Sequence, residues 1–409
     1  MTKPEINKLA AIIIPAIVLR LIFSALFFHP DIKKFHYQVQ FLKNGVINVY
    51  EYIAANKNLL PNSDTFNYPA GNYFLLGSWN MVSQIVLGSE FSQWQNDWGQ
   101  EAYSHPRMFE FMLILKFPYL ILDLLILALL IKINKSPITN HRLAILWLFN
   151  PISLYAIYML GQIDVICAAL TVSSLFLTTK GRLGWAALLL GLGAAVKTYP
   201  LLLLPFVIIR SSNFKQWLNS SVLGLFGFIL PLLPVITSSA FRSTMTQSNL
   251  TQYIFYAGIP VSVTQSIPIY VVVWVIAFWL SLNRRQNPNL LPEFLTLTLS
   301  VTLFSHFHAQ WIIWSLPFLI LLLVKNNKLW PVMLALMVGY FGTVFLIPDS
   351  FVLFGLFSSI NPQALIFPSI YEMVKTVSDP DFIQSIFHTV LAASGIWVII
   401  NAWKDYEQV

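Results

Sequence analysis

The run LAAIIIPAIVLRLIFSALFF, from Leu9 to Phe28, decides the fold class of this chain. A stretch of about 20 apolar residues is what an α-helix needs to cross a bilayer. The run is longer than the core of a signal peptide and lacks a clear small-residue cleavage site, so we expect it to remain as a membrane anchor. Further apolar runs follow at about 109–131, 143–160, 164–179, 183–197, 198–210, 217–238, 263–282, 289–305, 309–324, 329–347 and 384–402.

Residues 1–409 therefore predict a single all-α domain, a polytopic transmembrane helix bundle of about 12 spans. Hydrophobic residues make up 57% of the chain and charged residues 10%, whereas soluble domains carry about 25% charged residues. The net charge is +7, but the basic residues lie in short clusters between apolar runs, so nucleic acid is not an expected partner. The single cysteine, Cys167, excludes an intrachain disulfide and a multi-cysteine metal site. We expect no cofactor and no metal.

The basic clusters also predict the orientation of the spans. With the N-terminus inside, each inside loop carries Lys or Arg, and the short outside loops are nearly free of them. Residues 70–87 are apolar enough to form a span, but a crossing there would turn every later basic cluster outward. We therefore predict an interfacial or re-entrant helix at 70–87, within a long first outer loop over 29–108. A late outer loop, 348–383, is expected to carry another surface helix.

With this topology the unusual polar residues gather on the non-cytoplasmic face. Asp31 follows the first span directly. The other candidates lie in the long loop or at later outer turns, and they are Tyr68, Glu101, Arg107, Gln162, Asp164, Lys197, His306, His308 and Trp311.

Several of these residues also have a purely structural explanation. Asp31 could be a solvated helix end, and Gln162 and Asp164 could cap the following helix. Lys197 could extend its ammonium to the membrane surface. The two histidines could be interfacial hydrogen-bonding residues, and a metal pair is the least favoured interpretation because their i, i+2 spacing does not place them on one helix face.

Three ionisable residues lie deeper in the predicted spans, namely Arg20, Lys116 and Asp123. Charges inside a membrane are costly and normally pair. We therefore predict a structural ion pair between Asp123 and either Arg20 or Lys116. A transport relay is less favoured, because no acidic series continues toward the inner face.

The order of these features resembles the GT-C superfamily of polytopic glycosyltransferases that use lipid-phosphate sugars. The likeness is greatest to the dolichyl-phosphate-glucose glucosyltransferases of N-glycan precursor synthesis. The matching elements are Asp31, Tyr68-Pro69, Gly161-Gln162-Ile163-Asp164, Lys197 to Pro200, and His306. Three departures leave the sugar and the acceptor open. Ala70 replaces a second proline, no acidic residue follows His306, and no Asp-x-Asp pair follows the first span, unlike in the mannosyltransferases.

This resemblance implies a GT-C-like fold and an inverting transfer of a hexose from a polyprenyl- or dolichyl-phosphate sugar to a hydroxyl of a lipid-linked or glycan acceptor. Asp31 would be the base. The donor phosphate would meet Lys197, His306, His308 and Arg107. The substrate would also contact Tyr68, Glu101, Gln162, Asp164 and Trp311.

Two other functions remain open from the sequence. The first is a transporter or lipid-linked-sugar flippase without transfer activity, although no internal repeat supports it. The second is a non-catalytic membrane scaffold. The expected location is a prokaryotic inner membrane, with the active site on the non-cytoplasmic face and membrane lipid around the bundle.

Overall fold

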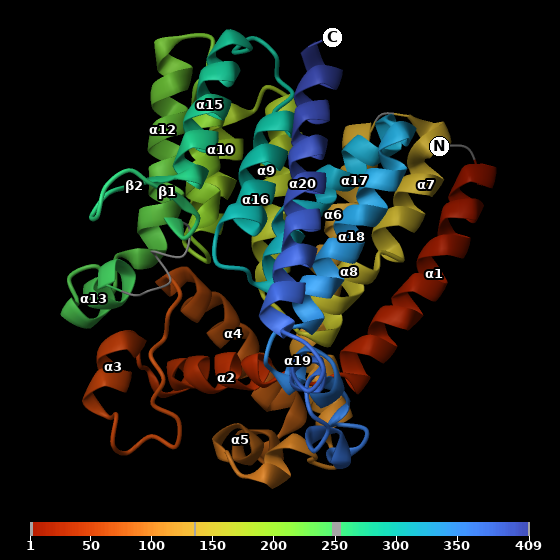
Figure 1. Cartoon of the computed structure of the whole chain (residues 1–409). Coiled ribbons are helices and arrows are strands. Elements are labelled where there is room, and N and C mark those ends of the chain that lie inside the picture. Colours follow the sequence, from red (N-terminus) through yellow and green to blue (C-terminus); the bar gives the residue numbers. More distant parts are fainter. Residues whose placement is uncertain (1–2, 135, 248–254, 408–409) are drawn as a thin grey trace.

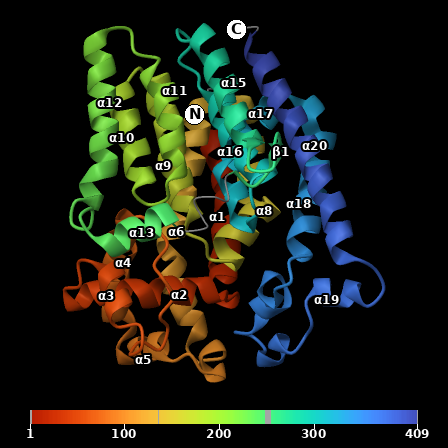
Figure 2. The ribbon, with the colours of Figure 1, turned by 60° about the vertical axis from the view of Figure 1, so that its left-hand side comes forward.

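The computed structural model describes residues 3–134, 136–247 and 255–407. Long helices stand side by side in one bundle, and shorter helices gather beneath one end of it (Figure 1). The chain ends marked N and C both lie at the other end of the bundle. Figure 2 shows the same separation from a second direction, with α2, α3 and α5 beneath the bundle.

The bundle is built almost entirely from helices. In the described part of the chain its elements are α1 (Lys3–Leu26), α6 (Met108–Asn134), α7 (Pro137–Leu148), α8 (Pro151–Ser153), η3 (Leu154–Met159), α9 (Asp164–Thr179), α10 (Leu183–Ala194), η4 (Tyr199–Leu203), α11 (Leu204–Ile208), α12 (Phe214–Ile229), η5 (Leu230–Leu232), α15 (Ile269–Asn283), α16 (Leu291–Phe304), η7 (Ala309–Trp314), α17 (Leu316–Lys325), η8 (Asn327–Leu329), α18 (Trp330–Phe345) and α20 (Pro380–Glu407).

The remaining elements lie in the loops between these helices. They are α2 (Pro30–Val39), η1 (Gln40–Asn44), α3 (Val49–Ala55), α4 (Ala70–Leu87), α5 (Ser89–Asn96), η2 (Gln100–Tyr103), α13 (Ser239–Gln247), the strands β1 (Gly258–Pro260) and β2 (Ser266–Pro268), η9 (Ser350–Val352), η10 (Phe354–Phe357), η11 (Pro362–Leu365) and α19 (Ile370–Lys375). We call α2, α3, α4 and α5 the cap.

Each predicted apolar run is helical over most of its length, so an all-α membrane bundle is confirmed. By length and composition, five helical segments of the described chain could cross a membrane, and six further apolar helices are 10–17 residues long. The number of crossings remains a prediction. The predicted span at 263–282 begins a few residues before the helix does. Strand β2 occupies the start of this run and pairs antiparallel with β1, and α15 begins only after Pro268, which has no N–H to continue the strand ladder.

The predicted helix at 70–87 is confirmed as α4, with the same bounds. It packs against α2 and η1 through one face, and its other face exposes Leu75, Met81, Val82, Ile85 and Val86. It is not among the five segments that could cross a membrane. An amphipathic helix of this kind suits the edge of a bilayer. In the late loop, the predicted helix corresponds to short 3-10 turns followed by α19.

The ion pair expected in the bundle core is also confirmed, and its cation is Arg20. The Nε of Arg20 lies 2.5 Å from Oδ2 of Asp123, and both side chains are fully buried. The hydroxyl of Tyr158 donates to the same carboxylate oxygen at 2.7 Å. This cluster joins α1, α6 and η3 at a point where an unpaired charge would be costly.

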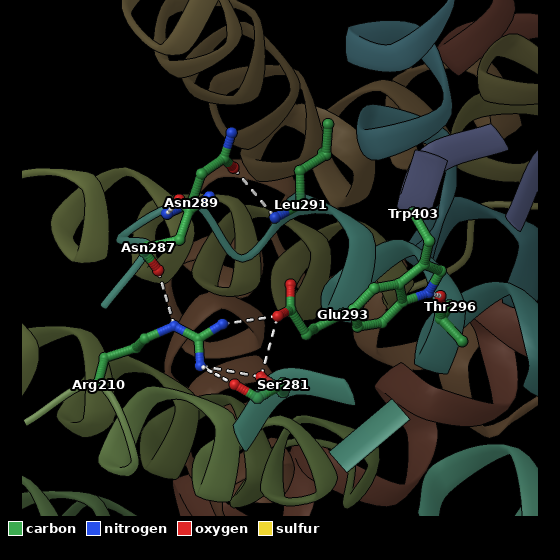
Figure 3. Close-up of polar contacts among 8 residues, drawn as sticks. All are labelled: Arg210, Ser281, Asn287, Asn289, Leu291, Glu293, Thr296 and Trp403. Atoms are coloured by element: carbon green, nitrogen blue, oxygen red, sulfur yellow. Dashed lines mark hydrogen bonds and ion pairs between the residues drawn. The ribbon is translucent and has the colours of Figure 1, made fainter. Parts of the chain in front are cut away.

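A second buried charge cluster joins α11, α15 and α16 (Figure 3). Arg210 donates to Oε1 of Glu293 at 2.6 Å and to the hydroxyl of Ser281 at 2.9 Å. Nearby, the indole of Trp403 donates to Thr296 at 2.9 Å and so attaches the end of α20. Since this cluster adjoins the end of α20, it lies far from the cap (Figure 1).

Candidate active site

Asp31 stands in the first turn of α2, directly after the first bundle helix. His29 caps that turn, because its Nδ1 accepts the backbone N–H of Asp31 at 3.1 Å. Buried Ile32 and Phe35 hold α2 against its neighbours, while the Asp31 side chain stays 41% exposed. Its Oδ2 accepts a hydrogen bond from Nε2 of Gln162 at 2.8 Å. The carboxylate is therefore oriented and still accessible.

Gln162 reaches Asp31 from a tight turn that favours glycine. The chain leaves the π-helical η3, and Gly161 then adopts a φ of 64°, in the left-handed region. The N–H of Gln162 donates to the carbonyl of Ala156 at 3.2 Å, which closes the turn. The predicted substrate residue Gln162 is thus a direct neighbour of Asp31.

Lys197 and Asp164 form a buried pair beside this turn. The ammonium of Lys197 lies 2.9 and 2.8 Å from the two carboxylate oxygens of Asp164. The indole of Trp314 donates to the same carboxylate at 2.5 Å. Asp164 therefore compensates the positive charge of Lys197, and binding of the donor phosphate by Lys197 remains a prediction.

Aromatic rings extend from this pair along one wall of a cavity of about 610 Å³. Tyr199 stacks on Trp314 with centroids 3.9 Å apart, and Trp314 stacks on Trp311 at 5.3 Å. The ring of His308 lies 4.4 Å from that of Trp311. Tyr68, Lys197, His308 and Gln310 also line this cavity, and its far end is apolar, with Phe228, Leu232 and Ile236. We call it the aromatic cavity.

The electrostatics of Tyr68 and His308 bring Asp31 into the same site. Burial raises the pKa of Tyr68 well above its usual value of 10, and the charges of Asp31 and Asp164 raise it further. Burial lowers the pKa of His308 to about 4; His306 and Lys197 add to this effect and Asp31 opposes it. His308 is consequently neutral at pH 7. Asp31, Asp164 and Lys197 therefore lie within electrostatic range of side chains that line the aromatic cavity.

The other predicted residues lie outside the aromatic cavity or at its rim. His306 is exposed and contacts the rings of Tyr256 and His308. Arg107 pairs with Glu90 at 3.0 Å and with Glu110 at 2.7 Å, at the junction of the cap and α6. Glu101 belongs to η2, and its side chain falls outside the described residues. Over the described residues, no three His, Cys, Asp or Glu side chains group as metal ligands.

Trp314, which connects the ion pair to the aromatic wall, is not among the residues predicted from the sequence. Trp311 and Trp314 are three residues apart in one helical segment, so they share a face. That spacing is the signal that could have identified it.

A second cavity of about 820 Å³ lies on the other side of α4's first turn. It runs between α4, α6, α9 and α10 and is lined by Leu75, Val82, Ile121, Leu170 and Leu192 among others. We call it the apolar groove. Gly71 and Ala195 line one part of it, and α4 packs so closely there that a Cβ on Gly71 would lie 2.5 Å from the carbonyl oxygen of Ala195. The hydroxyl of Tyr119 ends in this region with no hydrogen-bond partner among the described residues.

The described residues thus place a carboxylate, a buried ion pair and an aromatic cavity near one end of a helical membrane bundle. In agreement with this, the model of glycosyltransferase family 87 matches residues 111–306, just under half of the chain. The protein is therefore a membrane glycosyltransferase. The matched region contains Gln162, Asp164 and Lys197 but not Asp31. No protein of curated function matches the chain.

Proposed function

We propose that this glycosyltransferase moves a hexose from an isoprenoid-phosphate sugar to an acceptor hydroxyl on the non-cytoplasmic face, with inversion at the anomeric carbon. The observation that carries the proposal is the Asp31 carboxylate. It is oriented by Gln162, remains exposed, and lies within electrostatic reach of Tyr68 and His308 on the aromatic cavity.

In this reaction Asp31 removes the proton of the acceptor hydroxyl. The acceptor oxygen forms a bond to the anomeric carbon while the bond from that carbon to the phosphate oxygen breaks. The isoprenoid phosphate leaves with the electron pair of the broken bond, and the proton stays on Asp31. Gln162 occupies Oδ2 of the carboxylate, and no donor among the described residues contacts Oδ1, which faces the incoming hydroxyl.

The leaving phosphate would lie at the Lys197 end of the aromatic cavity. Two hydrogen-bond directions of the ammonium are used by Asp164, which leaves one N–H for a phosphate oxygen. His308 adds a neutral N–H, since its pKa of about 4 keeps it uncharged at pH 7. Trp311 is placed to stack on a sugar face. The leaving phosphate would therefore be stabilised by hydrogen-bond donors held in fixed positions, the ammonium of Lys197 and the ring N–H of His308.

Two apolar surfaces near this site suit the lipid chains of the donor and the acceptor. The apolar end of the aromatic cavity suits the isoprenoid chain that follows the donor phosphate. None of the described residues that line the apolar groove is cationic, so the groove suits an uncharged lipid chain of a membrane-anchored acceptor. Exposed Leu75, Val82 and Ile121 at its rim would face the bilayer.

The test is Asp31→Asn in purified protein, with a panel of polyprenyl-phosphate sugars as donors. We expect wild-type protein to consume one donor and the variant to be slower by about 100- to 10,000-fold, the usual contribution of a general base. Asp64→Asn is the matched control, because Asp64 pairs with Lys34 at the exposed surface of the cap loop and is 58% exposed. Wild-type turnover by folded Asp31→Asn would exclude Asp31 as the base.

A further inference from the structure

Lys116 is a fully buried cation that contacts no carboxylate in the described part of the chain. Its ammonium donates instead to three backbone carbonyls, those of Ser24 at 3.2 Å, Phe27 at 2.6 Å and Tyr158 at 2.7 Å. An ammonium has three N–H groups, so all of its donors are used. Lys116 consequently has no N–H left for a substrate. Its function must be to hold the chain segments whose carbonyls it binds.

The three carbonyls belong to the two segments that carry the proposed catalytic pair. Ser24 and Phe27 lie at the end of α1, where the helix dipole is negative and a cation is favoured. Phe27 precedes Asp31 by four residues, and Tyr158 precedes Gln162 by four residues. The ammonium thus joins the chain just before the base to the chain just before its hydrogen-bond partner.

The methylene stem of Lys116 fills the space beneath the same junction. A Cβ built on Gly161 would lie 3.1 Å from Cε of Lys116 and 3.3 Å from Cδ1 of Ile32, the residue after Asp31. The lysine side chain, the Gly161 turn and the first turn of α2 are therefore packed together. A shift in any one of them moves the other two.

We propose that Lys116 is a positioning residue, which sets the hydrogen bond between Asp31 and Gln162 and thereby the direction of the carboxylate. This inference rests on the proposed function, because it takes Asp31 as the base. A second contact also holds α1 against α6. It is the Arg20–Asp123 ion pair, which lies deeper between the same two helices. Loss of the Lys116 ammonium should therefore disturb the site more than the fold.

The test is Lys116→Met, which keeps the length of the stem and removes the charge. We expect kcat to fall by about 10- to 100-fold, the effect of a misplaced catalytic group, while KM for the donor stays within about twofold of wild type. Lys132→Met, at the exposed end of the same helix, is the matched control and should leave both constants unchanged.

A double-mutant cycle with Gln162→Ala separates positioning from a structural effect. If Lys116 acts through the Asp31–Gln162 contact, Lys116→Met should cost little further activity once Gln162 is alanine. Equal losses in both backgrounds, or wild-type kcat for Lys116→Met, would overturn the inference. If Lys116→Met does not fold, Gly161→Ala takes its place in the cycle, because it disturbs the same junction without removing the charge.

The outcome also distinguishes this inference from the proposed function. Full activity in Asp31→Asn would remove the proposed base itself. An inactive Asp31→Asn together with a fully active Lys116→Met would leave the base in place and refute only the positioning role.

Discussion

Asp164→Asn should destabilise the protein by about 3 kcal/mol. Asp164 is 1% exposed, and its carboxylate accepts from Lys197 at 2.9 and 2.8 Å and from Trp314 at 2.5 Å. Removing one partner of a buried ion pair typically costs about 3 to 5 kcal/mol, because the other charge stays buried and uncompensated. The lower end of that range applies here, because the asparagine oxygen can still accept from the Trp314 indole.

The double variant Asp164→Asn, Lys197→Met removes both charges at nearly constant volume. Stability should return to within about 1 kcal/mol of wild type, since neutral replacement of a buried pair is often tolerated. Activity should not return, because the proposed phosphate donor is gone. Unfolding midpoints in detergent, followed by tryptophan fluorescence, measure the first effect, and donor consumption by the same preparations measures the second.

Two results would refute this reasoning. Wild-type stability in Asp164→Asn would show that the carboxylate does not compensate Lys197. Recovery of both stability and activity in the double variant would show that Lys197 serves the fold alone.

Three further outcomes are expected. Arg20→Met should destabilise the protein by about 3 to 5 kcal/mol, because it leaves the Asp123 carboxylate buried and unpaired; Asp123→Asn added to it should restore part of the thermal stability. Burial lowers the pKa of His36 in the cap to about 3, so the unfolded chain binds more protons between pH 3 and 6.5 and stability should fall as the pH is lowered through that window. His36→Gln should flatten this dependence in pH-resolved thermal unfolding, and an unchanged slope would contradict it. Gly71→Ala should cost about 1 to 3 kcal/mol, since its Cβ would lie 2.5 Å from the carbonyl oxygen of Ala195, and an unshifted melting curve would show that α4 yields there.

Much of the fold follows from hydrophobic runs and from the placement of basic residues. The charge pattern alone separated 70–87 from the spans, and α4 has those bounds in the structure. The cost of charge in a membrane likewise predicted that Asp123 is paired. It could not choose between Arg20 and Lys116. Lys116 lies two helical turns from Asp123 on the same span, Arg20 lies at a comparable depth on the first span, and only the packing of α1 on α6 decides the partner.

The site was harder to predict because its contacts join distant segments. Asp164 and Lys197 are 33 residues apart and were treated as separate substrate contacts. Nothing in their local sequence shows that they neutralise each other. Arg107 was a candidate for binding the donor phosphate. In the structure it pairs with Glu90 of α5, and this contact depends on the path of the chain between α5 and α6. In general, the helical segments could be predicted from the sequence, and the partners of the polar side chains could not.

The Arg20–Asp123 pair has a consequence for biogenesis. The two residues are 103 positions apart in the chain. A charge near the centre of an inserting helix costs about 2.5 to 3.5 kcal/mol, so α1 enters the bilayer with an uncompensated guanidinium while the cap is still being synthesised. Only when α6 emerges from the ribosome does the carboxylate become available.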